Sequence, residues 1–72
     1  MSARDRKQIG ATVRRLRKQR SMTQEDLAWR AGVNTTVVGR LERGERDPRL
    51  STITAVARGL DVKPARLLDG LP

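Results

Sequence analysis

Apolar residues recur at steps of three and four along most of the chain, and no stretch alternates with a period of two for long enough to predict a β-strand. Such spacing places the apolar side chains on one face of each of several amphipathic helices. The pattern predicts five helices, at about 5–20, 24–31, 35–43, 52–60 and 64–69. We therefore expect an all-α fold whose helices share one small core.

Residues that favour the ends of helices lie between these apolar patterns. The expected N-caps are Ser2 or Asp5 for the helix at 5–20, Thr23 for 24–31, Asn34 for 35–43 and Ser51 for 52–60. Thr23 opens a capping box that Asp26 completes. Gly32 and Gly44 are expected to end their helices in the left-handed conformation, and Pro64 fits the first position of the last helix.

The composition argues against several classes of protein. The chain has 72 residues, which we interpret as a single domain over 1–72, and it contains no Cys and no His. A disulfide scaffold and the usual thiolate zinc sites are therefore excluded. The acidic residues form no nucleophile–base set, so we expect no enzyme activity, no metal, no cofactor and no small-molecule ligand. Without a membrane-spanning run or a signal peptide, the expected location is the cytoplasm.

The charge points to a partner. The 16 Lys and Arg residues outnumber the 8 Asp and Glu residues, which gives a formal net charge of +8. A positive field of this strength favours nucleic acid or an anionic membrane surface. The predicted helices are short and need their apolar faces for the core, which argues against membrane binding. Nucleic acid is therefore the favoured partner.

The helices at 24–31 and 35–43 are joined by Gly32, Val33 and Asn34 alone. Two short helices joined by a turn of three or four residues that contains Gly have the layout of a helix-turn-helix. Val38 and Leu41 anchor the inner face of the helix at 35–43. The outer face of that helix is then free to enter a DNA groove.

A set of ordered motifs gives the chain a specific resemblance to a known family. The motifs are Thr23-Gln24-Glu25-Asp26-Leu27-Ala28, Ala31-Gly32-Val33, Leu41-Glu42-Arg43-Gly44, Pro48, Ala57 and Leu60-Asp61-Val62. In this order and at these spacings, over residues from about 9 to 68, the chain resembles the Cro and phage-repressor helix-turn-helix family, also called the XRE type. The resemblance implies a compact, five-helix, lambda-repressor-like DNA-binding domain. It also implies a homodimer whose helix at 35–43 enters the major groove.

The expected DNA contacts lie on the helix at 35–43 and beside it. Arg40 can offer two donors to O6 and N7 of guanine, and Thr35 and Thr36 lie in the first turn, where recognition helices touch bases. The expected base contacts are Thr35, Thr36, Val37, Gly39 and Arg40, and the expected phosphate contacts are Gln24, Asn34, Arg43, Arg46 and Arg49. Gln24 lies at a helix N-terminus, which favours a phosphate.

Several positions have an alternative, purely structural interpretation. Asn34 can serve as a cap alone, and Val37 as a partly buried residue. Gly39 either lets the backbone approach DNA closely or meets a packing need, at a cost of roughly 1 kcal/mol against Ala. Trp29 is expected to be a partly buried surface aromatic, with contact to a protein partner as the alternative.

Two further expectations concern stability and assembly. The resemblance implies that Arg17 and Glu42 form a structural salt bridge between the helices at 5–20 and 35–43. Ser21 stands where the family often has Gly, which leaves the end of the helix at 5–20 open. The dimer interface is expected at Leu67, Leu68 and Leu71, because a monomer that exposed them would carry an apolar patch.

These features together predict a sequence-specific regulator of transcription that binds double-stranded DNA as a homodimer on an inverted-repeat operator. The subclasses left open are a Cro-like phage repressor, a restriction–modification controller protein and an antitoxin-type autoregulator. The location would be a bacterial nucleoid, or the gene would be carried by a phage. The alternative function is a protein–protein adaptor or coactivator of the same fold, which would use Trp29 and the basic helix at 5–20.

Overall fold

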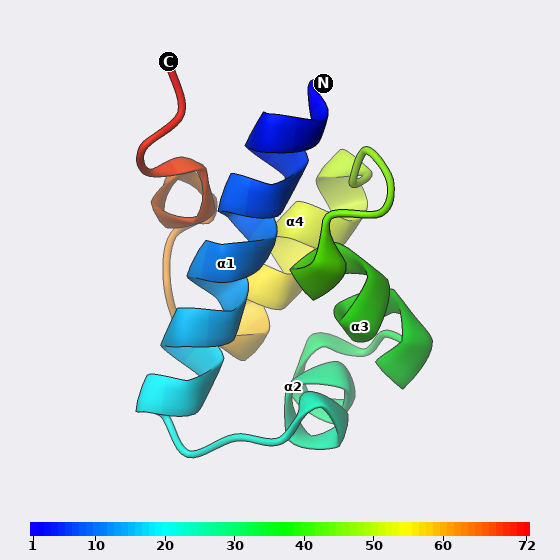
Figure 1. Ribbon diagram of the computed structural model, residues 1–72. Helices are drawn as coiled ribbons and strands as arrows, with labels where there is room; N and C mark the ends of the chain where they lie inside the picture. The colour runs from blue at the N-terminus through cyan, green and yellow to red at the C-terminus, as the bar shows by residue number, and fades with distance from the viewer.

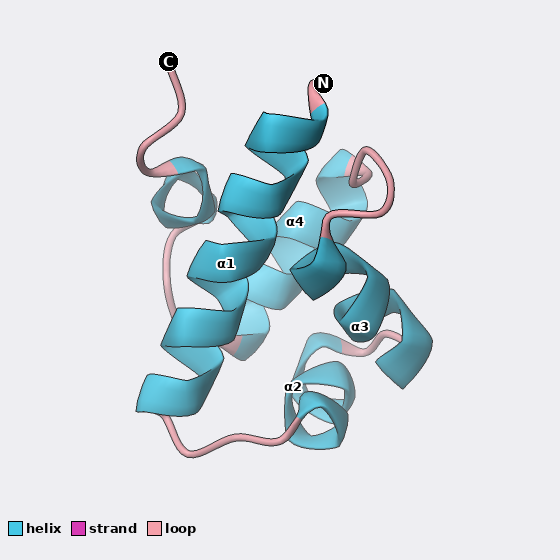
Figure 2. Ribbon diagram, viewed as in Figure 1, coloured by secondary structure: helices cyan, strands magenta, loops and turns pink.

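A computed structural model describes residues 1–72, and all of its regular structure is helical (Figures 1 and 2). Its elements are α1 (Ala3–Gln19), α2 (Gln24–Ala31), α3 (Thr35–Arg43), α4 (Leu50–Gly59) and a 3-10 helix, η1 (Pro64–Leu68). The predicted all-α fold is confirmed. The last element is a 3-10 helix of five residues rather than an α-helix, and 3-10 geometry is typical of so short a segment.

The helices enclose one core, to which every element contributes. α1 packs against α3 on one side and against η1 on the other, while α2 packs against α3 and α4 (Figure 1). Thirteen buried apolar residues form a single cluster, which comprises Ile9, Val13, Leu16, Leu27, Ala28, Ala31, Val38, Leu41, Ile53, Val56, Ala57, Leu60 and Leu67. Since each short helix buries its apolar stripe only against the others, helical stability here comes mainly from this packing.

The turn between α2 and α3 has the local contacts that the sequence predicts. In the capping box, Thr23 Oγ1 accepts from the Asp26 backbone N–H at 3.0 Å, and Asp26 Oδ2 accepts from the Thr23 N–H at 2.9 Å. Gly32 ends α2 with φ of +69°. Asn34 Oδ1 then accepts from the Thr36 N–H at 2.8 Å and begins α3. Local chemistry therefore fixes both ends of this turn.

The two ends of α1 settle the alternatives that the sequence left open. Ser2 is the N-cap, because its Oγ accepts from the Asp5 N–H at 3.0 Å. Ser21 follows α1 in the left-handed region, with φ of +54°, which glycine favours. The chain therefore makes the turn that the family's Gly would make, with a residue that adopts it less readily.

α1 approaches the end of α3 backbone to backbone at Gly10. A Cβ added at Gly10 would overlap the carbonyl oxygens of Leu41 and Glu42. These are backbone atoms, which cannot move aside as the tip of a flexible side chain can. Only glycine therefore allows α1 and α3 to lie this close.

Two expectations about α4 and α2 are wrong. α4 begins at Leu50 rather than at residue 52, and its N-cap is Arg49, which makes no side-chain cap hydrogen bond. Ser51 therefore lies inside the helix and does not cap it. The packing of the α4 core residues, rather than a side-chain cap, fixes its start.

Trp29 is 85% exposed rather than partly buried, because α2 turns its other face, with Leu27 and Ala28, to the core.

The expectation that Leu67 lies on an exposed dimer surface is also wrong. Leu67 has no exposed surface and belongs to the core, whereas Leu68 is 42% exposed. Leu71 is partly buried and packs against the core from beyond η1. The two adjacent leucines cannot both face inward from one short helix, and the position of η1 against α1 and α4 selects Leu67.

The contrast between the two leucines is testable by unfolding. Leu67→Ala is expected to lower the free energy of unfolding by about 2–5 kcal/mol, because it leaves a cavity in the core. Leu68→Ala is expected to cost much less, since its side chain keeps much of its contact with water. Urea titrations followed by circular dichroism measure both. Equal losses in the two variants would contradict the placement of η1.

Candidate nucleic-acid interface

A buried ion pair joins α1 to α3. Arg17 Nε donates to Glu42 Oε2 at 2.6 Å, and Arg17 Nη2 donates to Glu42 Oε1 at 3.0 Å. Only 10% of the Arg17 side chain and 4% of the Glu42 side chain are exposed. The hydrogen bonds to Glu42 raise the pKa of Arg17, so the guanidinium stays charged. The two residues that the resemblance pairs therefore do form a two-pronged salt bridge.

The same carboxylate also positions the start of α2. Gln24 Nε2 donates to Glu42 Oε1 at 3.1 Å, and Arg17 Nη1 donates to the Met22 carbonyl at 2.8 Å. α1, the α1–α2 turn, α2 and α3 thus meet at one set of polar atoms. Because a primary amide has two N–H donors, Gln24 keeps a second one for another acceptor.

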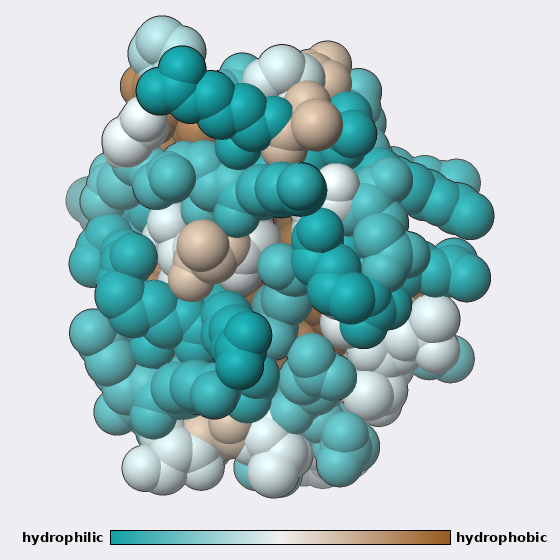
Figure 3. Space-filling model, in the orientation of Figure 1, coloured by the Kyte–Doolittle hydropathy of each residue, from teal (hydrophilic) through white to brown (hydrophobic).

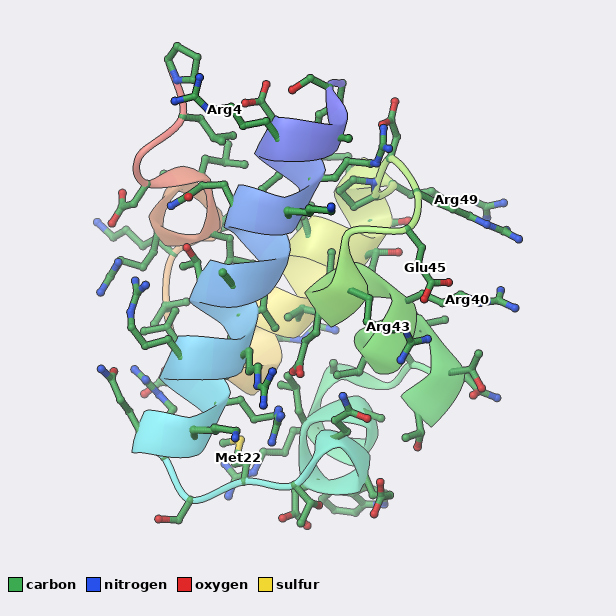
Figure 4. The ribbon with its side chains drawn as sticks, in the orientation of Figure 1. Arg4, Met22, Arg40, Arg43, Glu45 and Arg49 are labelled. Carbon is green, nitrogen blue, oxygen red and sulfur yellow. The ribbon has the colours of Figure 1, made fainter.

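The outer face of α3 carries arginines and no exposed acid. Val38 and Leu41 face the core, and Glu42 is turned inward to its partners. Arg40 and Arg43 are exposed, and Figure 4 shows Arg40 extending away from the body of the domain. Acidic and basic residues of α3 are therefore sorted to opposite faces.

A basic groove lies on each side of α3. One groove, between α1, the start of α2 and the end of α3, is lined by Arg14, Lys18, Gln24 and Arg43 among others. The other, between α3 and the start of α4, is lined by Arg40, Arg46, Arg49 and Thr52 among others. Hydrophilic side chains cover most of the face seen in Figure 3 and project at the edge where α3 lies. A helix flanked in this way matches a groove bordered by two phosphate strands.

The remaining predicted contact residues lie on or beside this face. Their exposure differs: Thr36, Asn34, Arg46 and Arg49 are exposed, Thr35 and Val37 are half-buried, and Gly39 is buried. Arg49 extends outward on the same side as Arg40 in Figure 4. Asn34 acts as the α3 cap through its side-chain oxygen, so its amide group is left for another partner. The structure thus brings Val37, Arg40, Arg46 and Arg49 to one groove and Gln24 and Arg43 to the other, whereas Gly39 is buried.

Two contacts of this surface were not predicted from the sequence. Glu45 accepts a hydrogen bond from Arg43 Nε, and that bond lowers the pKa of Glu45. Arg6, on α1, donates from Nε to the Gly44 carbonyl at 3.0 Å. Both depend on the path of the chain after the left-handed Gly44, with φ of +67°. The only signal in the sequence was the run of alternating charges at 43–47.

No group of three or more side chains is arranged to hold a metal ion. None of the helices combines the length and the apolar character that crossing a bilayer requires.

The chain is similar to known DNA-binding regulators. A helix-turn-helix family model (HTH_3) matches residues 13–67. The uncharacterized HTH-type transcriptional regulator y4dJ of Sinorhizobium fredii is 35% identical over 63 residues, which cover 88% of this chain and 82% of that protein. The control protein C.BamHI of Bacillus amyloliquefaciens is 37% identical over 62 residues, with 85% and 76% covered. The crystal structure of the restriction-modification controller protein C.AhdI from Aeromonas hydrophila superposes with a TM-score of 0.84 at 36% identity, covering 88% of this chain and 96% of that one.

Removal of one partner of the buried ion pair is expected to be costly. Glu42→Gln should lower the free energy of unfolding by about 3–5 kcal/mol, because it leaves the Arg17 charge buried without a counter-charge. The double variant Arg17→Met/Glu42→Leu should recover part of this loss, since no charge is then stranded. Asp69→Asn serves as the control, because it breaks the exposed pair between Arg66 and Asp69 and should cost little. Chemical denaturation measures all three, and a Glu42→Gln loss no larger than that of the control would contradict the role of the pair.

Proposed function

This chain belongs to the helix-turn-helix family, in its XRE-type branch, and is a non-enzymatic DNA-binding regulator of transcription; we propose that it acts as a homodimer on an inverted-repeat operator, with α3 in the major groove. The observation that carries the proposal is the outer face of α3, where Arg40 and Arg43 are exposed while the acid Glu42 is turned inward. A duplex would meet only cationic and neutral side chains along this helix.

The dimensions of α3 support its insertion into DNA. An α-helix with its side chains is about 10–12 Å across, which fits the major groove, about 12 Å wide. Arg40 extends from α3 away from the body of the domain (Figure 4) and would pair with O6 and N7 of guanine. Thr35, Thr36 and Val37, in the first turn, would contact the neighbouring bases. Gly39 is covered by the Arg43 side chain, so a contact of Gly39 with DNA would first require Arg43 to move.

The two grooves beside α3 would hold the phosphate strands. Gln24 and Arg43 lie on the side of α2, and Arg46 and Arg49 lie on the side of α4. Asn34, at the start of α3, would contact phosphate from the helix-turn-helix turn. Gln24 is already held by Glu42 at 3.1 Å, so its second N–H is oriented before DNA arrives. Contacts of this kind set the position of a protein on the duplex, whereas base contacts set its sequence preference.

Among the possible subclasses, we propose that the chain is a controller protein of a restriction–modification system. This proposal is favoured by the similarity to C.AhdI and C.BamHI, both of which match over most of their own length. Of the three leucines expected at the dimer interface, Leu68, 42% exposed at η1, is the one we propose as an apolar contact between two copies. The place of action would then be bacterial DNA.

Selection of bound sequences from a random DNA pool tests the proposed readout. The wild-type chain is expected to enrich an inverted repeat with half-site centres about ten base pairs apart. Arg40→Ala should relax the preference at one position in each half-site, at roughly 1–3 kcal/mol. Gln24→Ala should weaken binding to all sequences alike, since it removes a phosphate contact.

Arg58→Ala is the matched control for these variants. Arg58 lies in the last turn of α4, away from the α3 face, and its replacement removes the same charge. An unchanged preference in Arg40→Ala would overturn the placement of α3. If the wild-type chain enriches no sequence and its binding vanishes as salt rises, the adaptor function takes first place. Trp29, 85% exposed, would then be the surface to test.

The proposed homodimer is tested by sedimentation. The wild-type chain is expected to form dimers at high micromolar concentration, and Leu68→Glu is expected to shift it toward monomer, because a charge would replace an apolar contact. Arg66→Gln, two residues earlier on the same short helix, lowers the net charge by the same one unit and serves as the control. A chain that stays monomeric throughout this range, and on its selected DNA, would contradict the homodimer.

A further inference from the structure

The end of α3 carries an arginine that already has an acidic partner. Arg43 Nε donates to Glu45 Oε2, across the left-handed turn at Gly44. The pair is open to solvent, with 60% of the Arg43 side chain and 44% of the Glu45 side chain exposed. In Figure 4, Glu45 lies close to both Arg40 and Arg43, on the side of the molecule that α3 presents. An acid is therefore placed within a surface whose proposed ligand is a polyanion.

Gly39 makes room for the position that Arg43 adopts. A Cβ added at Gly39 would lie 3.0 Å from Arg43 Nη1 and 3.7 Å from its Cζ. Gly39 is buried although it lies beside the outer stripe of α3, because the guanidinium of Arg43 covers it. Arg43 is thus folded back along α3 rather than extended into solvent. Gly39 leaves space for the guanidinium, and the hydrogen bond to the Glu45 carboxylate holds it in this position.

We propose that Glu45 holds Arg43 back from DNA phosphate in the free protein, and that this restraint makes Glu45 a determinant of specificity. The inference rests on the proposed function, in which the α3 face binds duplex DNA. The Glu45 carboxylate occupies the Nε side of the Arg43 guanidinium. A phosphate that pairs on that side must displace it, and a phosphate that pairs with the remaining Nη donors meets its negative charge. The restraint therefore opposes binding unless other contacts bring a phosphate close to Arg43.

Operator and non-operator DNA differ in how well they can displace Glu45. Non-specific binding comes mainly from phosphates that lysines and arginines neutralise, with release of the counterions. Arg43, paired with Glu45, releases few counterions in a loose complex of this kind. On the operator, base contacts from Arg40 and its neighbours would hold α3 deep in the major groove. A phosphate would then come into contact with Arg43. Glu45 then weakens non-operator binding more than operator binding.

The basic groups near Glu45 keep its carboxylate in the charged form that pairs with Arg43. The hydrogen bond from Arg43 and the nearby charges of Arg40 and Arg46 lower the pKa of Glu45. The carboxylate is therefore ionised at neutral pH, and it repels phosphate when it is not paired. The Arg66–Asp69 pair has a similar composition, with Nη1 and Oδ2 at 2.6 Å, but η1 lies on the opposite side of α1 from α3 (Figure 1).

The salt dependence of binding to a non-operator duplex tests the inference. Glu45→Gln is expected to bind this duplex several-fold more tightly at low salt. Its plot of log K against log salt concentration should be steeper by about 0.9, the change expected for one additional phosphate contact. The ratio of operator affinity to non-operator affinity should fall. Asp69→Asn removes the same charge and breaks a similar pair away from α3, so it should leave both slope and ratio nearly unchanged.

A double-mutant cycle shows whether Glu45 acts through Arg43. In an Arg43→Gln background, Glu45→Gln should change the slope no more than Asp69→Asn does, because no arginine remains to be released. Equal effects of Glu45→Gln and Asp69→Asn in the wild-type background would overturn the inference, and so would an undiminished effect without Arg43. A wild-type chain that selects no duplex would instead contradict the proposed function. All three positions are exposed, and circular dichroism melts verify that each variant folds.

Discussion

The buried ion pair between Arg17 and Glu42 joins the helix that would read DNA to the longest helix of the domain. Pairs of this kind are costly to desolvate, and well-packed apolar residues often stabilise a protein as much. Compared with such apolar residues, the contribution of this pair is therefore to the orientation of the helices rather than to the free energy of unfolding. Two parallel hydrogen bonds fix the orientation of α3 against α1, and a third, from Gln24, ties the start of α2 to the same carboxylate. The whole outer surface of the helix-turn-helix therefore keeps one arrangement.

Several of the acids are turned inward or already engaged, which leaves more of the positive surplus to act on DNA. Glu42 is buried, Asp26 completes the capping box of α2 and Asp47 contacts Arg6 at 3.4 Å. Burial and local pairing weaken the effect of these charges on a distant phosphate. Glu45 differs from them, because it is exposed and engaged by an arginine of the proposed binding surface itself. The balance between attraction to any DNA and selection of one sequence depends on such single residues as well as on net charge.

The sequence predicted what local chemistry decides and failed where packing decides. The caps at Thr23 and Asn34 and the stop at Gly32 follow from contacts within three residues, so they were predictable. The start of α4 and the burial of Leu67 depend on elements distant in the chain, and both were predicted incorrectly. The candidate contact residues were found because they share one helix face and the turns beside it. The pairing of Arg43 with Glu45 depends on the turn at Gly44, and the identities of the residues do not reveal it.

The close approach of α1 to α3 at Gly10 has a consequence for the nucleic acid. The carbonyls of Leu41 and Glu42 lie where a Cβ of residue 10 would be, so α3 has no room to tilt or slide toward α1. Any adjustment of fit along this direction is then left to the duplex, which can bend or twist. Sequences differ in the energy that such deformation requires, even at base pairs that no side chain touches. Part of the preference of this regulator is therefore expected to reside in the mechanical properties of its DNA.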